Sequence, residues 1–254
     1  MFPNLLLLTK IVMIINYIPE GWEVIFQKSH GFLAMQIARQ WPIFLDKRWD
    51  ELLLAIAEHD DSQHGFSDRN YLNENGTPKD FTFNELSLYQ PSKVVESATY
   101  VSRFTTLLIS MHLTNLYEKY RHVNEDTAAF LDEQKTKQEK IILSMGLDKE
   151  IADKAYSIFH WCDRCSLILC KNEIPTRERK LEICKDISGE TSFIFTAENE
   201  IHVEPWPFNI SSFTVYVEAR ILRQLSFKDD QELMQKLETA DIFDKEWTFT
   251  KQLA

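Results

Sequence analysis

The chain has 254 residues, of which 44% are hydrophobic and only 6 are glycine, a composition typical of a globular protein and not of a disordered one. Its formal net charge of −11 argues against binding to the nucleic-acid backbone and against docking on anionic lipid, because both need an excess of Lys and Arg. We expect a single domain over residues 1–254, and small ligands remain open because net charge says little about the interior of a pocket.

The apolar start of the chain, residues 1–16, does not resemble a signal peptide. It has no basic residue before the apolar run, Lys10 interrupts that run, and no small-residue cleavage site follows. It is also too short to span a bilayer, and no other stretch approaches that length, so we expect no membrane association. Two alternatives remain open: residues 1–12 belong to the native protein, or Met13 is the true start.

The first predicted elements are a hairpin and two helices. Two runs of β-branched and aromatic residues meet at Pro19-Glu20-Gly21, which predicts a β-hairpin over residues 12–27. A short helix over residues 30–41 should follow and end before Pro42. In the next helix, residues 47–60, apolar side chains recur every three to four positions and place Asp60 at the end of the buried face, with His59 beside it.

Residues 61–90 contain turn formers such as Asn75-Gly76 and predict a long loop, a feature that is often functional. Three more helices are predicted over residues 91–120, 124–146 and 147–170. His112 falls on the apolar face of the first of these, and Asp163 lies at the edge of the apolar face of the last. Residues 30–172 thus predict a core of about five helices.

The C-terminal part, residues 185–254, is rich in strand-like segments and contains one helix, "DDQELMQKLE". We expect these strands to join the N-terminal hairpin in an antiparallel sheet packed against the helices. The predicted fold class is therefore α+β: a bundle of about five helices with an antiparallel sheet formed by both ends of the chain.

Several polar residues fall on apolar helical faces, where an unpaired carboxylate is costly to bury. They are His30, the pair His59 and Asp60, His112, and Asp163. A divalent cation bound by their imidazole nitrogens and carboxylate oxygens would make this burial tolerable. These donors suit Mn, Fe, Zn, Co or Ni better than a thiolate-binding metal.

Each residue also has a simpler interpretation. A single histidine such as His112 is more often a hydrogen-bonded core residue than a ligand, and Asp163 could pair with a neighbouring Arg or Lys. The pair Asp60 and Asp61 is harder to explain in this way, because acidic groups at the end of a helix oppose the helix dipole. A structural protein with no site at all is the third alternative, and in that case these side chains would lie far apart.

The order His, His-Asp and a distant Asp on separate helices resembles the HD superfamily of metal-dependent phosphohydrolases. A closer resemblance is to an uncharacterised bacterial family, domain of unknown function 3891. It is carried by Gln27 to His30, "AIAEHDD", Pro78 to Phe81, Ser110 with His112, Asp163 to Cys170 and Pro205 to Phe208. It covers most of the chain from Met13. One departure is Ser62, which follows the second Asp where a Gly is common.

The HD resemblance implies a fold, a metal and a reaction. It implies an HD-like helical core in which His30, His59, Asp60, His112 and Asp163 bind the cation, with Asp60 bridging if two ions bind. It also implies that the cation activates water for attack on phosphorus. Asp61 or His64 would then act as general base or acid, and Arg164 or Lys28 would counter phosphate charge.

Two other motifs have structural interpretations that we favour. The C-x-x-C spacing of Cys162 and Cys165 also occurs in zinc and redox sites, but no second such pair exists and buried cysteines are common. "EPWPF" is typical of a sheet-edge strand, although it could also form a recognition surface. The clustering of all four cysteines favours reduced thiols and a cytoplasmic location.

The sequence therefore predicts a divalent-metal-dependent phosphohydrolase of HD type that acts on a small phosphorylated compound or a nucleotide. The alternative is a non-catalytic metal- or ligand-binding module that has kept the pocket and lost turnover. Fold analogy does not choose the substrate.

Overall fold

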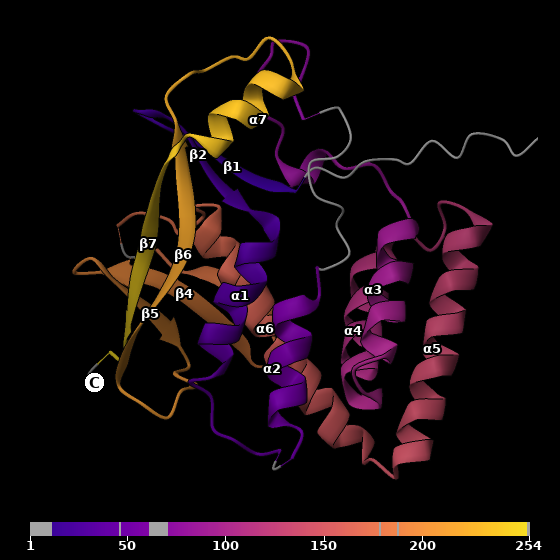
Figure 1. Cartoon of the computed structure of the whole chain (residues 1–254). Coiled ribbons are helices and arrows are strands. Elements are labelled where there is room, and N and C mark those ends of the chain that lie inside the picture. The colour runs from indigo at the N-terminus through magenta and orange to yellow at the C-terminus, as the bar shows by residue number, and fades with distance from the viewer. Residues whose placement is uncertain (1–11, 46, 61–70, 178, 187, 253–254) are drawn as a thin grey trace, which may run out of the picture.

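The computed structural model describes residues 12–45, 47–60, 71–177, 179–186 and 188–252. In this part of the chain it contains seven α-helices and one curved, mixed sheet of seven strands, an α+β fold (Figure 1). The predicted HD-like bundle of about five helices with an antiparallel sheet is therefore wrong. The differences lie in the number of helices and in how the strands are joined.

The sheet combines strands from both ends of the chain in the order β1-β2-β6-β7-β5-β4-β3. Neighbouring strands are antiparallel except β5 and β7, which are parallel where Ile201 pairs with Phe249. This parallel pair makes the sheet mixed and not antiparallel as predicted. The strands are β1 Met13–Ile18, β2 Gly21–Phe26, β3 Leu181–Lys185, β4 Thr191–Ala197, β5 Glu200–Glu204, β6 Ser212–Leu222 and β7 Asp241–Thr250.

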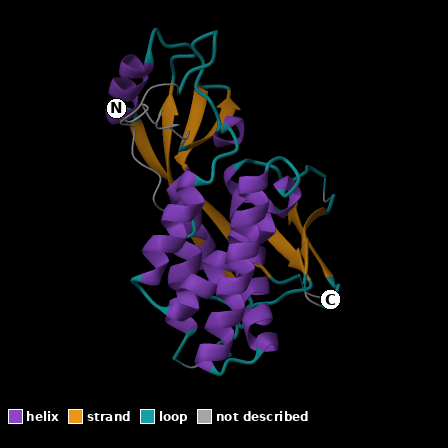
Figure 2. Cartoon of the chain, turned by 90° about the vertical axis from the view of Figure 1, so that its right-hand side faces the viewer, coloured by secondary structure: helices purple, strands orange, loops and turns teal. Residues whose placement is uncertain are grey.

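Six of the seven helices form layers on one side of the sheet (Figures 1 and 2), and the last one packs on the other face, in a second core with Met13 and Val24. Helices α1 (Gln27–Ala38) and α6 (Lys149–Cys170) pack against each other and contact the sheet. Helices α2 (Trp49–Glu58) and α4 (Arg103–Tyr117) pack on this pair. Helices α3 (Tyr89–Thr99) and α5 (Glu125–Met145) flank α4, and α7 (Asp230–Glu238) lies beside β6.

Two helices differ most from the prediction. The segment predicted as one helix over residues 91–120 is divided, because Ser102 is in an extended conformation and caps α4 by accepting a hydrogen bond from the amide of Thr105 at 3.0 Å. Helix α1 begins at Gln27, directly after β2, three residues before its predicted start and at the residue that was predicted to end the hairpin. Strand β3 was not predicted.

Other local signals act as the sequence indicates. Asn124 caps α5 through a 2.8 Å hydrogen bond to the amide of Thr127, and Gly146 ends that helix in the left-handed conformation at φ 57°. The main core fills the space between the sheet and the helices. Phe208 of "EPWPF" is buried there and packs edge-on against Trp161, so the segment has a structural role. It is not a sheet-edge strand as predicted, because Pro205 to Phe208 follow β5, which lies between β7 and β4.

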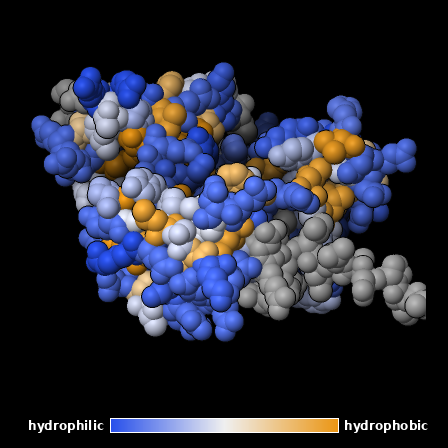
Figure 3. Space-filling model, turned by 90° about the horizontal axis from the view of Figure 1, so that it is seen from above, coloured by the Kyte–Doolittle hydropathy of each residue, from blue (hydrophilic) through white to orange (hydrophobic). Residues whose placement is uncertain are grey.

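The face seen from above is mostly hydrophilic, and its hydrophobic side chains form separate small groups (Figure 3). Among the described helices, none has the length and apolar content needed to cross a membrane.

Candidate metal centre

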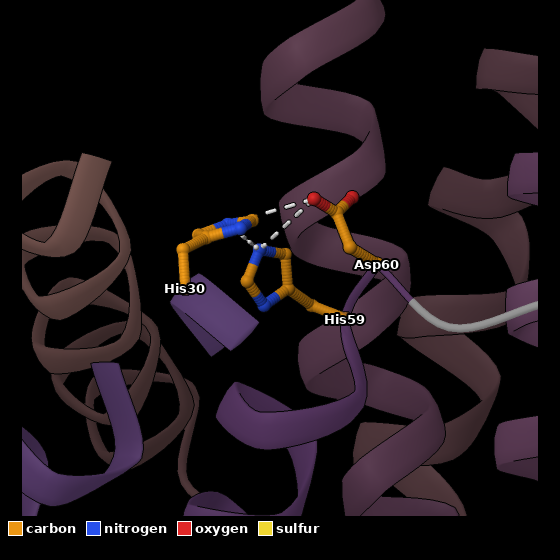
Figure 4. Close-up of side chains that lie close together, drawn as sticks. All are labelled: His30, His59 and Asp60. Atoms are coloured by element: carbon orange, nitrogen blue, oxygen red, sulfur yellow. Dashed lines mark hydrogen bonds and ion pairs between the residues drawn. The ribbon is translucent and has the colours of Figure 1, made fainter. Parts of the chain in front are cut away.

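Four helices contribute the side chains of the centre. His30 belongs to α1, His59 ends α2, His112 belongs to α4 and Asp163 belongs to α6. Each of α1, α2 and α4 contacts α6, and α2 also contacts both α1 and α4. Residues that are distant in sequence therefore meet at one point inside the helical layers, and His30, His59 and Asp60 are drawn together in Figure 4.

Gly31 allows α1 and α2 to approach closely next to the centre. A Cβ atom at this position would lie 2.7 Å from the backbone oxygen of Ala57, a distance that real Cβ atoms do not show. Because Gly31 follows His30 and Ala57 precedes His59 by two residues, the same close contact brings the two imidazoles together. The rings are 5.0 Å apart between centroids.

The donor atoms of four residues converge. The Nε2 atoms of His30 and His59 are 3.2 Å apart, and the Oδ1 atom of Asp163 lies 3.3 Å from the first and 3.1 Å from the second. The Oδ2 atom of Asp60 lies 3.5 Å from His30 and 3.8 Å from His59. For metal–donor bonds of about 2.1 Å, donors separated by about 90° lie about 3.0 Å apart, and tetrahedral donors about 3.4 Å apart. The observed spacings fit a shared cation.

Backbone carbonyls orient both imidazoles. The Nδ1 atom of His30 is hydrogen-bonded to the carbonyl of Gln27, and the Nδ1 atom of His59 to the carbonyl of Ile56 at 2.7 Å. A carbonyl can only accept, so both Nδ1 atoms carry the proton, and in the neutral rings both Nε2 atoms present lone pairs. Two acceptors that face each other and a carboxylate repel unless a proton or a cation lies between them. Carbonyl partners of this kind are also common around metal-binding histidines.

His112 lies on the other side of Asp163. Its Nε2 atom is 3.9 Å from the Oδ2 atom of Asp163, and its ring stacks on Phe159 with centroids 4.6 Å apart. Both ring nitrogens are buried, and neither has a hydrogen-bond partner in the described part of the chain. Burial lowers the pKa of His112 to about 3, so the ring is neutral at physiological pH, as a metal ligand must be.

The charges in the centre are strongly coupled. Burial by itself lowers the pKa of His59, but the carboxylates of Asp163 and Asp60 outweigh it and raise that pKa from 6.5 to about 9. Burial likewise raises the pKa of Asp163, yet the positive charge of His59 and its hydrogen bond hold that pKa well below its usual range. Without a cation, one proton held by His59 compensates the facing acceptors.

The structure brings together the five predicted metal ligands. Described donors with metal-binding spacing form two groups that share His59, and neither group contains a cysteine. They are His30, His59 and Asp60, and His59, His112 and Asp163. The alternative in which these side chains lie far apart is thereby excluded. Within the described residues, Asp163 pairs with histidines and with no Arg or Lys.

The predicted catalytic residues have other outcomes. Arg164 forms an ion pair of 3.1 Å with Glu173 and none with a carboxylate of the described centre, so a structural role accounts for its position. Asp61 and His64 lie outside the described residues. All four cysteines are free thiols, and burial raises the pKa of Cys170 to about 12, so its thiolate is suppressed.

Sequence reasoning missed one side chain in the centre. The amide Nε2 of Gln27 donates a hydrogen bond of 2.9 Å to the Oδ2 atom of Asp60. A signal was present, since Gln27 precedes His30 by three residues, the spacing at which a backbone carbonyl reaches a histidine one helical turn later. Only the contact with Asp60 needed the tertiary structure.

Comparisons with known proteins place the chain in one family. No curated protein and no solved structure matches it. The relation to the HD superfamily finds no support there. A family model described as "Protein of unknown function (DUF3891)" matches residues 13–224, which is most of the chain and includes all five metal-ligand candidates. The protein therefore belongs to the DUF3891 family.

Proposed function

We propose that this protein binds a divalent cation through His30, His59, Asp60, His112 and Asp163 and uses it to hydrolyse a small phosphorylated compound or a nucleotide. The observation that supports the metal is the meeting of two imidazole lone pairs and a carboxylate oxygen within 3.3 Å of one another. Burial of such a set is costly without a positive charge at its centre.

The chemistry of the donors fits the metal. Three imidazoles and two carboxylates suit Mn, Fe, Zn, Co or Ni. A divalent cation in this position would act as a Lewis acid that lowers the pKa of a bound water molecule and polarises a phosphoryl oxygen. Among the ligands, Asp60 is the most accessible, with 21% of its side chain exposed against 7% for Asp163, so substrate would approach from the side of Asp60.

The chain's own residues divide the remaining tasks. The two oxygens of Asp163 point to different partners, Oδ1 to His30 and His59 and Oδ2 to His112. Asp163 can therefore hold the two halves of the centre in one geometry, including a second ion if one binds. Asp61 and His64 remain our candidates for proton transfer. Separately, the free thiols support our proposal of a cytoplasmic location.

One observation favours a second function, a non-catalytic metal-binding module. His30, His59, His112 and Asp163 are all buried, and catalytic cations usually keep an open coordination position. If all five side chains bind a single ion, little room is left for substrate. In that case the cation would stabilise the helical layers and not perform a reaction.

Metal analysis and a substrate screen together test the proposal. We expect the purified protein to contain near-stoichiometric transition metal and, when loaded, to hydrolyse members of a panel of phosphomonoesters, phosphodiesters and nucleotides. Asp60→Ala should abolish that hydrolysis. Bound metal without turnover would favour the module. No bound metal, together with no thermal stabilisation by Mn, Fe or Zn, would refute the centre itself.

A further inference from the structure

We propose that Gln27 is a positioning residue of the metal centre, which fixes the carboxylate of Asp60 through its side chain and the imidazole of His30 through its backbone. This inference rests on the proposed metal site. It assigns a role to a residue that is not itself a ligand, and it explains how ligands from two separate segments keep one geometry.

The side chain of Gln27 is the first part of the evidence. The residue is buried, with 7% of its surface exposed, and its amide Nε2 lies 2.9 Å from the Oδ2 atom of Asp60. That oxygen is the same one that approaches the Nε2 atoms of His30 and His59. Asp60 lies just after the last turn of α2, outside the helix. The side-chain amide of Gln27 therefore restricts the direction in which the carboxylate of Asp60 points.

The backbone of Gln27 is the second part. Its carbonyl accepts the hydrogen bond from the Nδ1 atom of His30, which leaves the Nε2 atom of that ring free to bind a cation. Its amide nitrogen donates to the carbonyl of Val12 at 2.7 Å, just before β1. Gln27 is therefore held by the edge of the sheet, and through one residue the sheet sets the positions of two ligands.

The second atom of the amide points to a ligand as well. The Oε1 atom of Gln27 is buried and has no hydrogen-bond partner among the described residues. Because Nε2 must face the carboxylate of Asp60, Oε1 is left as an acceptor beside the centre. A water molecule or a substrate hydroxyl at the centre would supply the missing donor, since buried acceptors are rarely left unpaired.

The proposal is tested by measuring the affinity of the full chain for Co²⁺ and Mn²⁺ by calorimetry, with the visible absorption of bound Co²⁺ as a second readout. Gln27→Met keeps the length of the side chain and the backbone carbonyl but removes the donor. We expect it to lower the affinity about 10- to 100-fold, as loss of an outer-shell partner does, and to change the Co²⁺ spectrum. If Gln27→Met does not fold, Gln27→Asn replaces it. This variant moves the amide away from Asp60 by one methylene and should lower the affinity by a similar factor.

Two controls separate positioning from general damage. Gln134→Leu removes another buried glutamine, whose Oε1 atom accepts from Ser110, and should leave Co²⁺ affinity unchanged. In an Asp60→Ala background, Gln27→Met should have no further effect on affinity, because the amide no longer has a carboxylate to hold. A folded Gln27→Met protein that binds Co²⁺ within twofold of the wild type, with the same spectrum, would overturn the role of Gln27 while leaving the metal centre intact. A wild-type protein that binds neither ion would overturn both.

Discussion

Two buried polar clusters lie on different sides of α4, and they differ in how their donors and acceptors meet. On the side of α5, the hydroxyl of Ser110 donates to the Oε1 atom of Gln134 at 3.0 Å. The amide of Gln138 donates to the hydroxyls of Ser110 at 3.0 Å and of Thr114 at 3.2 Å. Every one of these contacts joins a donor to an acceptor, so the cluster is complete as it stands.

On the side of α6, His30, His59 and Asp163 bring acceptors to face acceptors, and both nitrogens of His112 lack partners in the described chain. Burial of polar groups is therefore common to both clusters and does not distinguish a site. The distinguishing feature is that acceptors face acceptors without a donor between them, and an added cation would bind to all of them. Variants of the two clusters should therefore behave differently when a metal ion is added.

The largest effect on metal affinity is expected from Asp163→Asn in the cluster beside α6, and Gln134→Leu in the cluster beside α5 is its control. Asp163→Asn keeps the shape of the side chain but removes its charge, and it should lower metal affinity by more than about 100-fold, because even outer-shell changes cost about 10- to 100-fold. Gln134→Leu should leave metal affinity unchanged and lower the free energy of unfolding by about 1–3 kcal/mol, since Ser110 loses its acceptor. Calorimetric titration and urea denaturation measure both. Equal metal binding by Asp163→Asn and the wild type would contradict the comparison.

The next effect is a pH dependence of the metal centre alone. The cation must displace the proton held by His59, whose pKa is raised to about 9, so affinity should rise about tenfold per pH unit up to pH 9 and then level off. Titrations at several pH values in one non-coordinating buffer system measure this slope. An affinity that does not change between about pH 7 and pH 9 would show that no such proton is displaced.

The same pKa shifts predict the stability of the metal-free protein. The pKa of His59 is raised from 6.5, so its stabilising contribution is full below pH 6.5 and is lost as the pH rises through about 9. The pKa of Asp163 is lowered from 3.8, so its contribution is present above that pH and is lost as the pH falls through the lowered value. Denaturant unfolding in the presence of a chelator should follow both trends, and added metal should remove the loss on the alkaline side.

The smallest effect concerns helix approach. Gly31→Ala places a Cβ atom against the backbone of Ala57, which cannot move aside easily, and should lower the free energy of unfolding by about 1–3 kcal/mol. It should also weaken metal binding, because it separates α1 from α2 beside His30. Gly76→Ala is the control away from the centre: its Cβ atom would lie 2.5 Å from the backbone oxygen of Phe227, and its φ of +74° adds backbone strain. It should destabilise the protein without changing metal affinity, and equal losses of affinity in both variants would contradict the role of Gly31.

Periodicity predicted which side chains come together because each ligand candidate lies on or beside an apolar helical face. His59 and Asp60 follow the buried face of α2, and Asp163 lies at the edge of that of α6. That these faces meet at one point depended on packing between distant helices. The contact of Gln27 with Asp60 joins residues 33 positions apart and leaves no pattern in either segment.

The sequence was less informative about the fold. The break at Ser102 was missed because the surrounding apolar residues keep a helical spacing across it, and only the capping hydrogen bond to Thr105 reveals the new start. The parallel pairing of β5 with β7 was also missed, since strand-like composition does not specify a partner or a direction. The predicted antiparallel sheet was the simplest arrangement of the same strands.

The position of β7 has a consequence for the order in which the protein folds. This strand is the last in the described chain and lies outside the family match, yet it is the only link between β6 and β5 in the described sheet. All five ligand candidates are synthesised earlier. During translation the helical layers can therefore assemble while the sheet still consists of two unconnected halves, β1-β2-β6 and β5-β4-β3, each with an open hydrogen-bonding edge. The two halves join into one sheet, through pairing with β7, only after residue 250 has emerged from the ribosome.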